Sequence, residues 1–214
     1  STSLAAIINE LNMRDAQHIV TIEDPIEFVY PKSRSIISQR EIGRDSLSWA
    51  KALKSCLRED PDIVLVGEMR DYETIQSVLT VAETGHLVFS TLHTGSTTEA
   101  LNRIIDVFPS HQQNQIKSSL ANSLVAVVAQ RLLPTTDGNS RVPSIEILLN
   151  HSSVSPLIRE GKIFQLDNVI ETSEQSGMIL FEKYLSKLYD DGQITKQTAH
   201  SYAIRKNIIT HLIP

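Results

Sequence analysis

The chain has 214 residues, 41% of them hydrophobic and 21% charged, with a formal net charge of −5 at neutral pH. These values are ordinary for a globular protein with a sizeable core, and they argue against a general affinity for nucleic acid or for an anionic membrane surface. No apolar stretch approaches the roughly 18 residues of a membrane span and no signal peptide is visible, so a cytoplasmic protein is expected.

Helical and strand patterns alternate along the first 150 residues. The chain opens in a helical pattern, with Leu4, Ile7, Ile8 and Leu11 on one stripe. Strands are then predicted at 18–24, 35–40, 63–66 and 86–93, and helices at 45–60, 71–84, 97–107 and 110–132. Asp45 or Ser46 is the expected N-cap of the helix at 45–60. The apolar face of this helix contains the single cysteine, Cys56, which excludes a disulfide framework and is expected to be a buried hydrophobe.

A hairpin and a helical tail complete the chain. Residues 131–148 read as a hairpin with Asp137-Gly138 at its turn. Four short helices are predicted after it, at 153–162, 164–177, 178–192 and 195–205. Because helices that alternate with buried strands indicate a parallel sheet, the prediction is an α/β core over 1–150 with an appended helical subdomain over 151–214.

Acidic residues follow two of the predicted strands. Glu23 and Asp24 end the first strand, Glu27 follows Pro25 and so lies on a loop where it can orient towards a ligand, and Glu68 follows the apolar run at 63–66. If the two strands are neighbours, these carboxylates approach one edge of the sheet, where they would repel one another unless a cation pairs with them. Mg²⁺-nucleotide chemistry needs such an arrangement, with one acid near the metal and one to orient or deprotonate water. The alternative is that they are solvated loop residues or helix N-caps, as Asp71 is expected to be.

Polar residues also follow the predicted strand at 86–93. Thr91, His93 and Thr94 should reach the same edge, where a polar side chain could contact a γ-phosphate. For His86 a structural role is the favoured interpretation. For His93, which is followed by Thr-Gly-Ser, a functional role is the better hypothesis.

A nucleotide-hydrolysing enzyme also needs a phosphate-binding loop. The chain has eight glycines and no G-x-x-x-x-G-K-[ST] pattern. However, it begins Ser1-Thr2 already in a helical pattern, and the helix after such a loop starts at the Lys-Ser/Thr of the motif. We therefore expect a longer protein with the loop immediately before residue 1, and we expect the Ser1 hydroxyl to ligate Mg²⁺.

Three segments of the sequence resemble those of a known family. "TIEDPIE" looks like an acidic box, "REDPDIVLVGEMRD" like a Walker B segment, and "AETGHLVFSTLHT" like a histidine box. Together they resemble the secretion-superfamily ATPases, the hexameric motors of type IV pili and of type II and type IV secretion. The PilT-like pilus-retraction motors and the DotB- and TraJ-like motors of type IVB secretion and conjugation are the most similar branches. The resemblance implies a RecA-like P-loop NTPase core that here lacks the loop's glycines and lysine and the family's amino-terminal domain.

The resemblance also implies roles for individual residues. Glu27 would be the general base and Glu68 the Walker B acid, which would hold Mg²⁺ with Ser1, while His93 would be a further catalytic residue. The implied nucleotide-binding residues are Ser1, Thr2, Glu23, Arg40, Arg44, Arg58, His86 and Arg103, with one arginine acting on a neighbouring subunit.

The function implied is that of an ATP-hydrolysing motor subunit, with ATP and Mg²⁺ as its cofactors. It would form a homo-hexamer, lie peripheral to the bacterial inner membrane, contact secretion or pilus platform proteins, and have no stable nucleic-acid partner. The tail reads "SVSPLIRE", with Pro156, where retraction motors carry a segment like "AIRNLIRE", which favours secretion over pilus retraction. A non-hydrolysing assembly scaffold and a DNA-pumping ATPase are the alternatives.

Overall fold

A computed structural model describes residues 1–214. The chain divides into two compact units, Ser1–Leu92 and His93–Pro214. The predicted domain boundary at residue 150 does not coincide with this division, because the hairpin before residue 150 lies with the helical tail in the second unit.

The first unit is built on a four-stranded parallel sheet. Its strands are β1 (His18–Glu23), β2 (Ile36–Glu41), β3 (Ile63–Val66) and β4 (Leu87–Ser90), in the order β2-β1-β3-β4. The four strands expected from the sequence are present, and the two that end in acidic residues, β1 and β3, are neighbours in the centre. All four side chains of β3 are buried, as expected for a strand that is covered on both faces.

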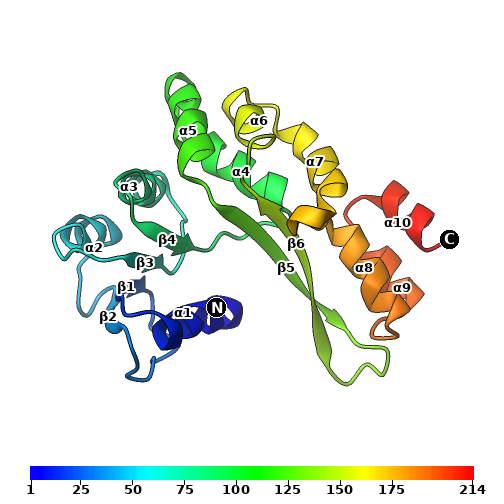
Figure 1. Ribbon diagram of the computed structural model, residues 1–214, viewed down its shortest axis with the longest axis horizontal. Coiled ribbons are helices and arrows are strands. Elements are labelled where there is room, and N and C mark those ends of the chain that lie inside the picture. Colours follow the sequence, from blue (N-terminus) through cyan, green and yellow to red (C-terminus); the bar gives the residue numbers. More distant parts are fainter. The chain divides into compact units, whose positions relative to one another are not determined.

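Helices cover both faces of this sheet (Figure 1). Side chains alternate along β1 and β3, so that Ile19, Ile63 and Leu65 pack with Ile8 of α1 (Thr2–Arg14). The intervening residues, including Val20 and Val64, pack instead with the helices α2 (Trp49–Cys56) and α3 (Tyr72–Glu83).

The helix α2 starts later than the sequence suggested. Its N-cap is Ser48, whose side chain accepts a hydrogen bond from Lys51 N, so the prediction of Asp45 or Ser46 was wrong. Asp45 instead accepts a hydrogen bond from Glu41 N in the turn that follows β2. Short polar side chains favour both roles, and only the local backbone decides between them.

The connection from β1 to β2 contains no helix. Residues 24–35 cross back as irregular chain, and Asn12 of α1 holds them. The Asn12 backbone oxygen accepts hydrogen bonds from Arg34 N at 3.1 Å and from Ser35 N at 3.3 Å, and its side-chain amide donates to Pro31 O at 2.9 Å. The buried Asn12 therefore fixes the path of this connection against α1.

The second unit begins with two helices and a long hairpin. They are α4 (Thr97–Asp106), α5 (Ser110–Ser123), β5 (Ala126–Pro134) and β6 (Arg141–Leu149), and the two strands pair in antiparallel register. The prediction of one helix from residue 110 to about Leu132 was wrong, because the Val-rich segment after Ser123 pairs with β6. The hairpin turn does contain Asp137-Gly138, and Gly138 adopts a φ of +70°, which glycine tolerates without strain.

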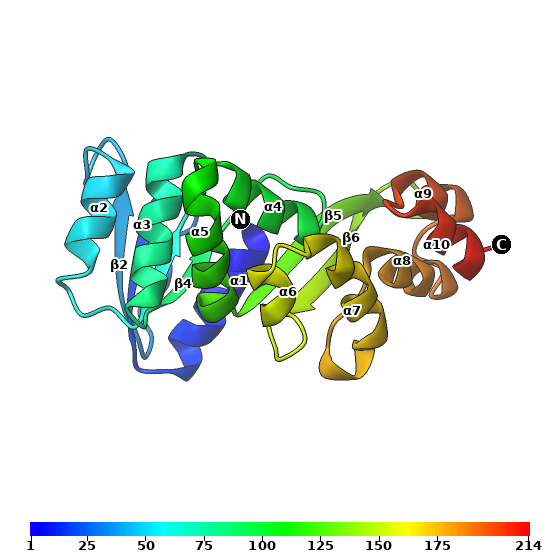
Figure 2. The ribbon, with the colours of Figure 1, turned by 90° about the horizontal axis from the view of Figure 1, so that it is seen from above.

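The tail contains no further strand and has one more helix than the four predicted. Its helices are α6 (Ser155–Arg159), α7 (Leu166–Thr172), α8 (Phe181–Asp190), α9 (Lys196–Tyr202) and α10 (Lys206–Leu212), with two 3₁₀ turns at Ile163–Gln165 and Glu174–Ser176. Figure 2 shows α8, α9 and α10 gathered beside the hairpin, where Leu133 of β5 enters their apolar core. None of the helices is long and apolar enough to cross a membrane.

Candidate active site

The four strands of the first unit end at the same edge of the sheet, here called the carboxyl edge. Gly67 continues the pairing past the end of β3, since its N–H donates to Ile22 O at 2.8 Å. A Cβ at Gly67 would lie 3.4 Å from the Cα of Glu23 and from the oxygen of Ile22, so the two backbones approach closely here. The acid that follows, Glu68, thus leaves the sheet beside the end of β1, and the predicted neighbourhood of the two acidic segments is confirmed.

Glu27 combines a free carboxylate with a fixed backbone. Its side chain is exposed and takes part in no hydrogen bond or ion pair. Its two neighbours are both held by side chains of β2. Ile26 N donates to Glu41 Oε2 at 3.1 Å, and Phe28 O accepts from Gln39 Nε2 at 2.8 Å. An unpaired carboxylate on a held loop is suited to accept a proton from a bound substrate or water.

Glu23 occupies a different environment, although it lies only four residues away. Its side chain is buried, and its Oε1 accepts hydrogen bonds from Thr21 Oγ1 at 2.7 Å and from Gln39 Nε2 at 3.3 Å. These contacts give Glu23 a role in holding β1 and β2 at the carboxyl edge. A nucleotide contact by Glu23 stays a prediction.

Glu68 lies at the end of the central strand β3, and its side chain is only 16% exposed. It forms an ion pair with the side chain of Arg70, which is far more exposed. The Glu68 carboxylate therefore lies close to the sheet, and its negative charge is paired with the exposed Arg70 side chain. A cation or its waters could take the place of Arg70.

Thr91 reaches the carboxyl edge as predicted, but its hydroxyl hydrogen is used within the protein. The hydroxyl donates to the backbone oxygen of Gly67 at 2.6 Å. The same residue's carbonyl accepts from Met69 N at 3.0 Å. Thr91 therefore joins the ends of β3 and β4 and is not available as a donor to a phosphate.

Two of the predicted nucleotide-binding residues lie at the opposite edge of the sheet. His86 precedes β4, and its Nδ1 lies 3.1 Å from Val81 O and 3.0 Å from Thr84 Oγ1. Arg58 follows α2 and precedes β3. Parallel strands begin at the edge opposite to the one where they end, so the structure does not bring His86 or Arg58 to the acids of their own subunit.

The other arginines of the first unit differ in their partners. Arg40 is held inside the subunit, since it donates to Glu59 Oε2 at 2.5 Å and to Ser55 Oγ at 3.0 Å. Arg44 is exposed in the turn after β2, at the carboxyl edge, and its side chain has no partner. Arg44 is therefore free to contact a ligand or another subunit, whereas Arg40 would first have to leave Glu59.

Ser1 and Thr2 start the helix that runs antiparallel to β1. The amino end of α1 therefore lies on the side of the carboxyl edge. Both side chains are exposed, and the Ser1 side chain does not cap the helix. The first N–H groups of a helix attract anions, so this position suits a phosphate beside the acids.

His93 and Arg103 belong to the second unit. His93 is exposed, and its backbone oxygen accepts a hydrogen bond from Arg103 Nη1 at 3.4 Å. The helix α4 begins shortly after His93, with Ser96 as its N-cap, and Ser96 Oγ accepts from Glu99 N at 3.2 Å. The contact between Arg103 and the backbone of His93 was not foreseen from the sequence.

The oxygen donors at the carboxyl edge are few. No group of three or more His, Cys, Asp and Glu side chains is placed to hold a metal ion by itself. Mg²⁺ in phosphoryl-transfer sites is usually held by one or two protein oxygens together with substrate phosphates and water. The Ser1 hydroxyl and the Glu68 carboxylate are oxygen donors of that kind, so the residues fit a metal that is bound together with the nucleotide.

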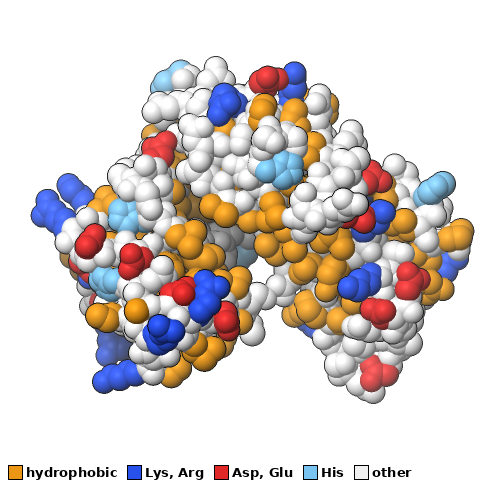
Figure 3. Space-filling view, in the orientation of Figure 1, with side chains coloured by type: hydrophobic (Ala, Val, Ile, Leu, Met, Phe, Trp, Pro, Cys, Tyr) orange, Lys and Arg blue, Asp and Glu red, His pale blue; other side chains and the backbone are white.

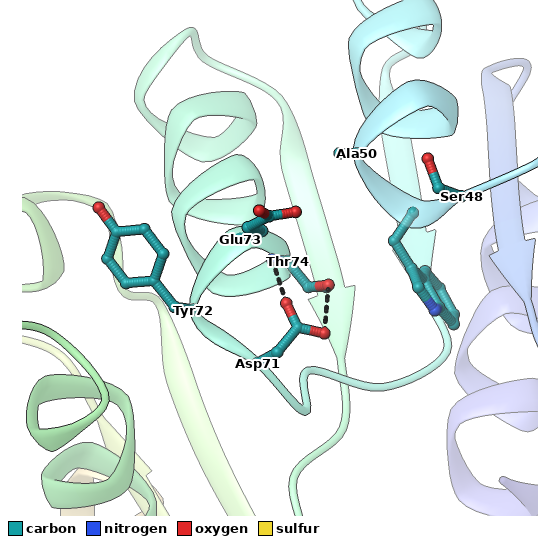
Figure 4. A pocket seen from close by; sticks show the side chains of 7 residues that line it. Ser48, Ala50, Asp71, Tyr72, Glu73 and Thr74 are labelled. Carbon is teal, nitrogen blue, oxygen red and sulfur yellow. Dashed lines mark hydrogen bonds between the residues drawn. The ribbon is translucent and has the colours of Figure 1, made fainter.

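A shallow pocket lies between the amino ends of α2 and α3 (Figure 4). Asp71 caps α3 here, as predicted, by accepting from Thr74 N at 2.9 Å, and Glu73 lines the pocket beside it. Helix amino ends attract anions, but these two carboxylates repel them. The pocket therefore does not fit a phosphate.

Sequence reasoning missed Gln39 and Glu41, which hold the backbone on either side of Glu27. Both lie in β2, which has no acidic or histidine motif of its own. Their role depends on the packing of β2 against the loop around residue 27, which precedes it in the chain. No local sequence pattern reveals this contact.

The parallel sheet, the helices on both faces and the acidic carboxyl edge define the class of protein, a RecA-like P-loop type of α/β core. The chain belongs to the family described as "Type II/IV secretion system protein", whose profile matches residues 1–197. The predicted family and fold class are thereby confirmed.

Several characterised proteins are similar to most of this chain. It is 51% identical over 203 residues to a "Twitching motility protein" of Neisseria gonorrhoeae, which covers 95% of this chain and 54% of that protein. It is 45% identical over 203 residues to the "Type IV pilus retractation ATPase PilT" of Pseudomonas aeruginosa, covering 95% of this chain and 59% of that one.

Solved structures support the same relationship. The crystal structure of the pilus retraction motor PilT with bound ADP superposes with a TM-score of 0.91 at 41% identity, over 98% of this chain and 59% of that chain. The ATPase DotB of Legionella pneumophila superposes with a TM-score of 0.84 at 29% identity, over 94% of this chain and 55% of that chain. The chain thus spans little more than half the length of these relatives.

Proposed function

We propose that this chain is the catalytic part of an ATP-hydrolysing motor subunit. The observation that carries the proposal is the exposed, unpaired carboxylate of Glu27 on a held loop at the edge where Glu68 ends the neighbouring strand. A second support is the similarity to PilT and DotB, both of which are named as motors or ATPases.

In the proposed reaction, water attacks the γ-phosphate of ATP. Glu27 orients this water and accepts its proton, and its carboxylate is available for this role because it has no partner within the protein. Glu68 holds water or metal ligands at the end of β3, and Mg²⁺, when bound, would neutralise charge on the β- and γ-phosphates. Ser1, Thr2 and the amino end of α1 would face the phosphates, while His93 and Arg103 keep the roles predicted from their motifs.

The proposed assembly is a homo-hexameric ring in which a neighbouring subunit completes the site. The unpaired Arg44 at the carboxyl edge is the arginine that the structure favours for this role, because Arg40 is bound to Glu59. Val29 and Leu47, which are 85% and 81% exposed, lie in the same loops as Glu27 and Arg44. Exposed apolar side chains of this size would be covered if a neighbouring subunit packed against these loops. Figure 3 shows hydrophobic side chains interspersed with charged and polar ones on one face of the molecule.

Among the machines served by this family, a type IV pilus is the favoured one. Among the solved structures, the identity of 41% to the pilus retraction motor PilT, against 29% to DotB, outweighs the departure at Pro156. Pro156 lies in the first turn of the helix α6, where proline is tolerated. The proposed location is the cytoplasmic face of the bacterial inner membrane, in contact with platform proteins of the pilus or of a related secretion system.

Two alternatives predict different properties. A non-hydrolysing scaffold has no need of a free carboxylate at residue 27 or of the acid at residue 68. A DNA-pumping ATPase needs a basic surface that faces DNA, and the net charge of −5 gives no support to one.

The test is Glu27→Gln in the full-length protein. Since the amide fills the same space but cannot take up a proton, turnover should fall by about 10²- to 10⁴-fold while ATP binding measured by calorimetry is nearly unchanged. Glu83→Gln is the matched control, because Glu83 is an exposed glutamate at the end of α3, towards the opposite edge of the sheet. Turnover within a few-fold of the wild type in Glu27→Gln would transfer the role of base to Glu68.

A further inference from the structure

A carboxylate in the second unit is buried completely and uses both of its oxygens. Glu146 lies on β6 with no exposed surface. Its Oε1 accepts hydrogen bonds from the backbone N–H of Thr97 at 2.9 Å and from the Thr97 hydroxyl at 2.8 Å. Its Oε2 accepts from Arg205 Nη1 at 2.8 Å and from Phe181 N at 3.3 Å. One side chain therefore links the first residue of α4 to the helical tail.

Arg205 extends this link to three elements of the tail. Its Nε and Nη2 donate to the two oxygens of Asp167 in α7, at 2.8 and 2.6 Å. Its Nη1 also donates to Glu182 Oε2 in α8 at 3.0 Å, and its backbone N–H donates to Glu182 Oε1 at 2.7 Å. Arg205 directly precedes α10, so α7, α8, α10 and β6 meet at one guanidinium.

Arg205 keeps its positive charge in this buried place. Burial alone would lower the pKa of Arg205, but its bonds to Asp167 and Glu146 more than offset this effect and raise the pKa well above its ordinary value. Three carboxyl groups surround this one guanidinium, and those of Glu146 and Glu182 are fully buried. Apolar side chains of similar size often stabilise such a position better than ion pairs do, so stability alone does not account for this arrangement.

A second arginine makes a parallel link. Arg131 on β5 donates to Gly95 O at 3.3 Å and to Tyr202 O at 3.4 Å, and its guanidinium lies 5.3 Å from the centre of the Phe181 ring. A Cβ at Gly95 would collide with the end of the Arg131 side chain, so the absence of a side chain there permits this contact. The segment His93–Ser96 is thus held to the tail by its own backbone and through Thr97.

We propose that Glu146 is a positioning residue that holds the segment His93–Ser96, and with it His93, in a position set by the helices α7, α8 and α10. The proposal rests on the proposed function only in the role given to His93. Its consequence is that a partner which binds and shifts the tail helices changes the position of His93, although the partner itself makes no contact with the nucleotide.

The first test is Glu146→Gln in the full-length protein. An amide has one acceptor and one donor end, so it can satisfy Thr97 or Arg205 but not both. Hydrogen exchange in a peptide covering residues 93–98 should accelerate by about tenfold or more, since one charged, buried hydrogen bond is lost. Glu174→Gln is the matched control, because Glu174 forms an exposed ion pair with Lys183 in the same unit and should leave this exchange unchanged.

Kinetics supply the second readout. If Glu146 acts by placing His93, Glu146→Gln should lower kcat by about tenfold or more and leave KM for ATP within about twofold, because misplacement affects the reacting geometry rather than binding. In a His93→Gln background the same substitution should cause little further loss. General damage to the fold would instead multiply with the effect of His93→Gln.

A milder variant covers the case in which Glu146→Gln does not fold. Thr97→Val removes one hydroxyl and leaves Arg205 and all three carboxylates paired, and Thr97→Ser restores the donor. Faster exchange at 93–98 in Thr97→Val, with recovery in Thr97→Ser, supports the proposal. Unchanged exchange in Thr97→Val, or equal effects of the Glu146 and Glu174 substitutions, overturns it. Because exchange does not require turnover, a protein that fails to hydrolyse ATP would refute the proposed function and leave this test intact.

Discussion

The hydroxyl of Thr91 donates to the backbone oxygen of Gly67 at 2.6 Å, just beyond the ends of β4 and β3. The Thr91 carbonyl in turn accepts from Met69 N at 3.0 Å. These two bonds enclose Glu68, so the backbone that carries this acid is fixed from both sides. The sheet therefore extends its hydrogen bonding past its last regular residues, at the place where the chemistry is proposed.

Thr91→Val should destabilise the protein by about 1 kcal/mol, because valine keeps the shape of threonine but leaves the Gly67 oxygen without its donor. Thr91→Ser retains the donor and serves as the control, with a smaller loss. Urea denaturation of the three proteins measures the difference in the free energy of unfolding. Equal stability of the valine variant and the wild type would contradict the structural role given to this bond.

Substitution of Arg40 should lower the stability of the protein, whereas substitution of Arg44 should leave it nearly unchanged. Arg40→Met removes a half-buried ion pair with Glu59, whose side chain is 27% exposed, and should cost on the order of 1 kcal/mol of stability. Arg44→Met should leave stability within about 0.5 kcal/mol, since the side chain has no partner.

In the assembled protein, Arg44→Met should lower ATP turnover by about 10³-fold or more if the arginine acts on the next subunit. Mixing Arg44→Met with Glu27→Gln subunits should then restore part of the activity, because some sites in mixed rings keep both groups. Absence of complementation, together with full activity of a diluted monomer, would refute the shared site.

Tyr30 should make stability fall at alkaline pH. Burial, and secondarily the charge of Glu23, raises the pKa of Tyr30 from its ordinary value near 10 to about 12 in the folded protein. Between these two pH values the unfolded chain loses the phenolic proton first, so the favourable contribution is complete below pH 10 and is lost as the pH rises towards 12.

The free energy of unfolding, measured at pH 9 and pH 11, should therefore drop further in the wild type than in Tyr30→Phe. A parallel pH dependence in the two proteins would show that Tyr30 is more accessible than the fold implies.

Cys56 should be inert in the native protein. It is fully buried on α2, and burial, with a further effect of Glu59, raises the pKa of its thiol to about 11. Only about one molecule in a thousand then carries the reactive thiolate at pH 8. Alkylation should be slow in buffer and rapid in denaturant, whereas comparable rates would indicate frequent opening of the packing around α2.

The sequence was a good guide where one local pattern determines the outcome. The run Ile63–Val66 between Pro61 and Gly67 predicts a buried strand, and the acids after it and after β1 predict that two acidic segments meet at the carboxyl edge. It failed at residues 124–132, where the apolar run "LVAVVAQRL" fits a helix or a strand by periodicity. In the structure, residues 126–132 of this segment pair with β6, a long-range contact that periodicity cannot reveal.

Long-range contacts also explain what the sequence did not reveal in the second unit. Glu146 and Arg205 are 59 positions apart, and neither belongs to a recognisable motif. Conversely, the histidine motif suggested a nucleotide contact for His86 as well as a catalytic role for His93, although His86 precedes β4 and His93 follows it. The direction of a strand, rather than the spacing of residues, determines which of two neighbouring side chains reaches a given edge.

The irregular connection between β1 and β2 is clamped on two sides, by Asn12 of α1 and by Gln39 and Glu41 of β2. These contacts attach the connection to both the helix and the strand, and the two bonds from β2 lie directly on either side of Glu27. The Glu27 backbone is therefore restricted before any substrate binds. A carboxylate on a held backbone has mainly its own side-chain torsions to order, which reduces the entropy lost on aligning it with a substrate.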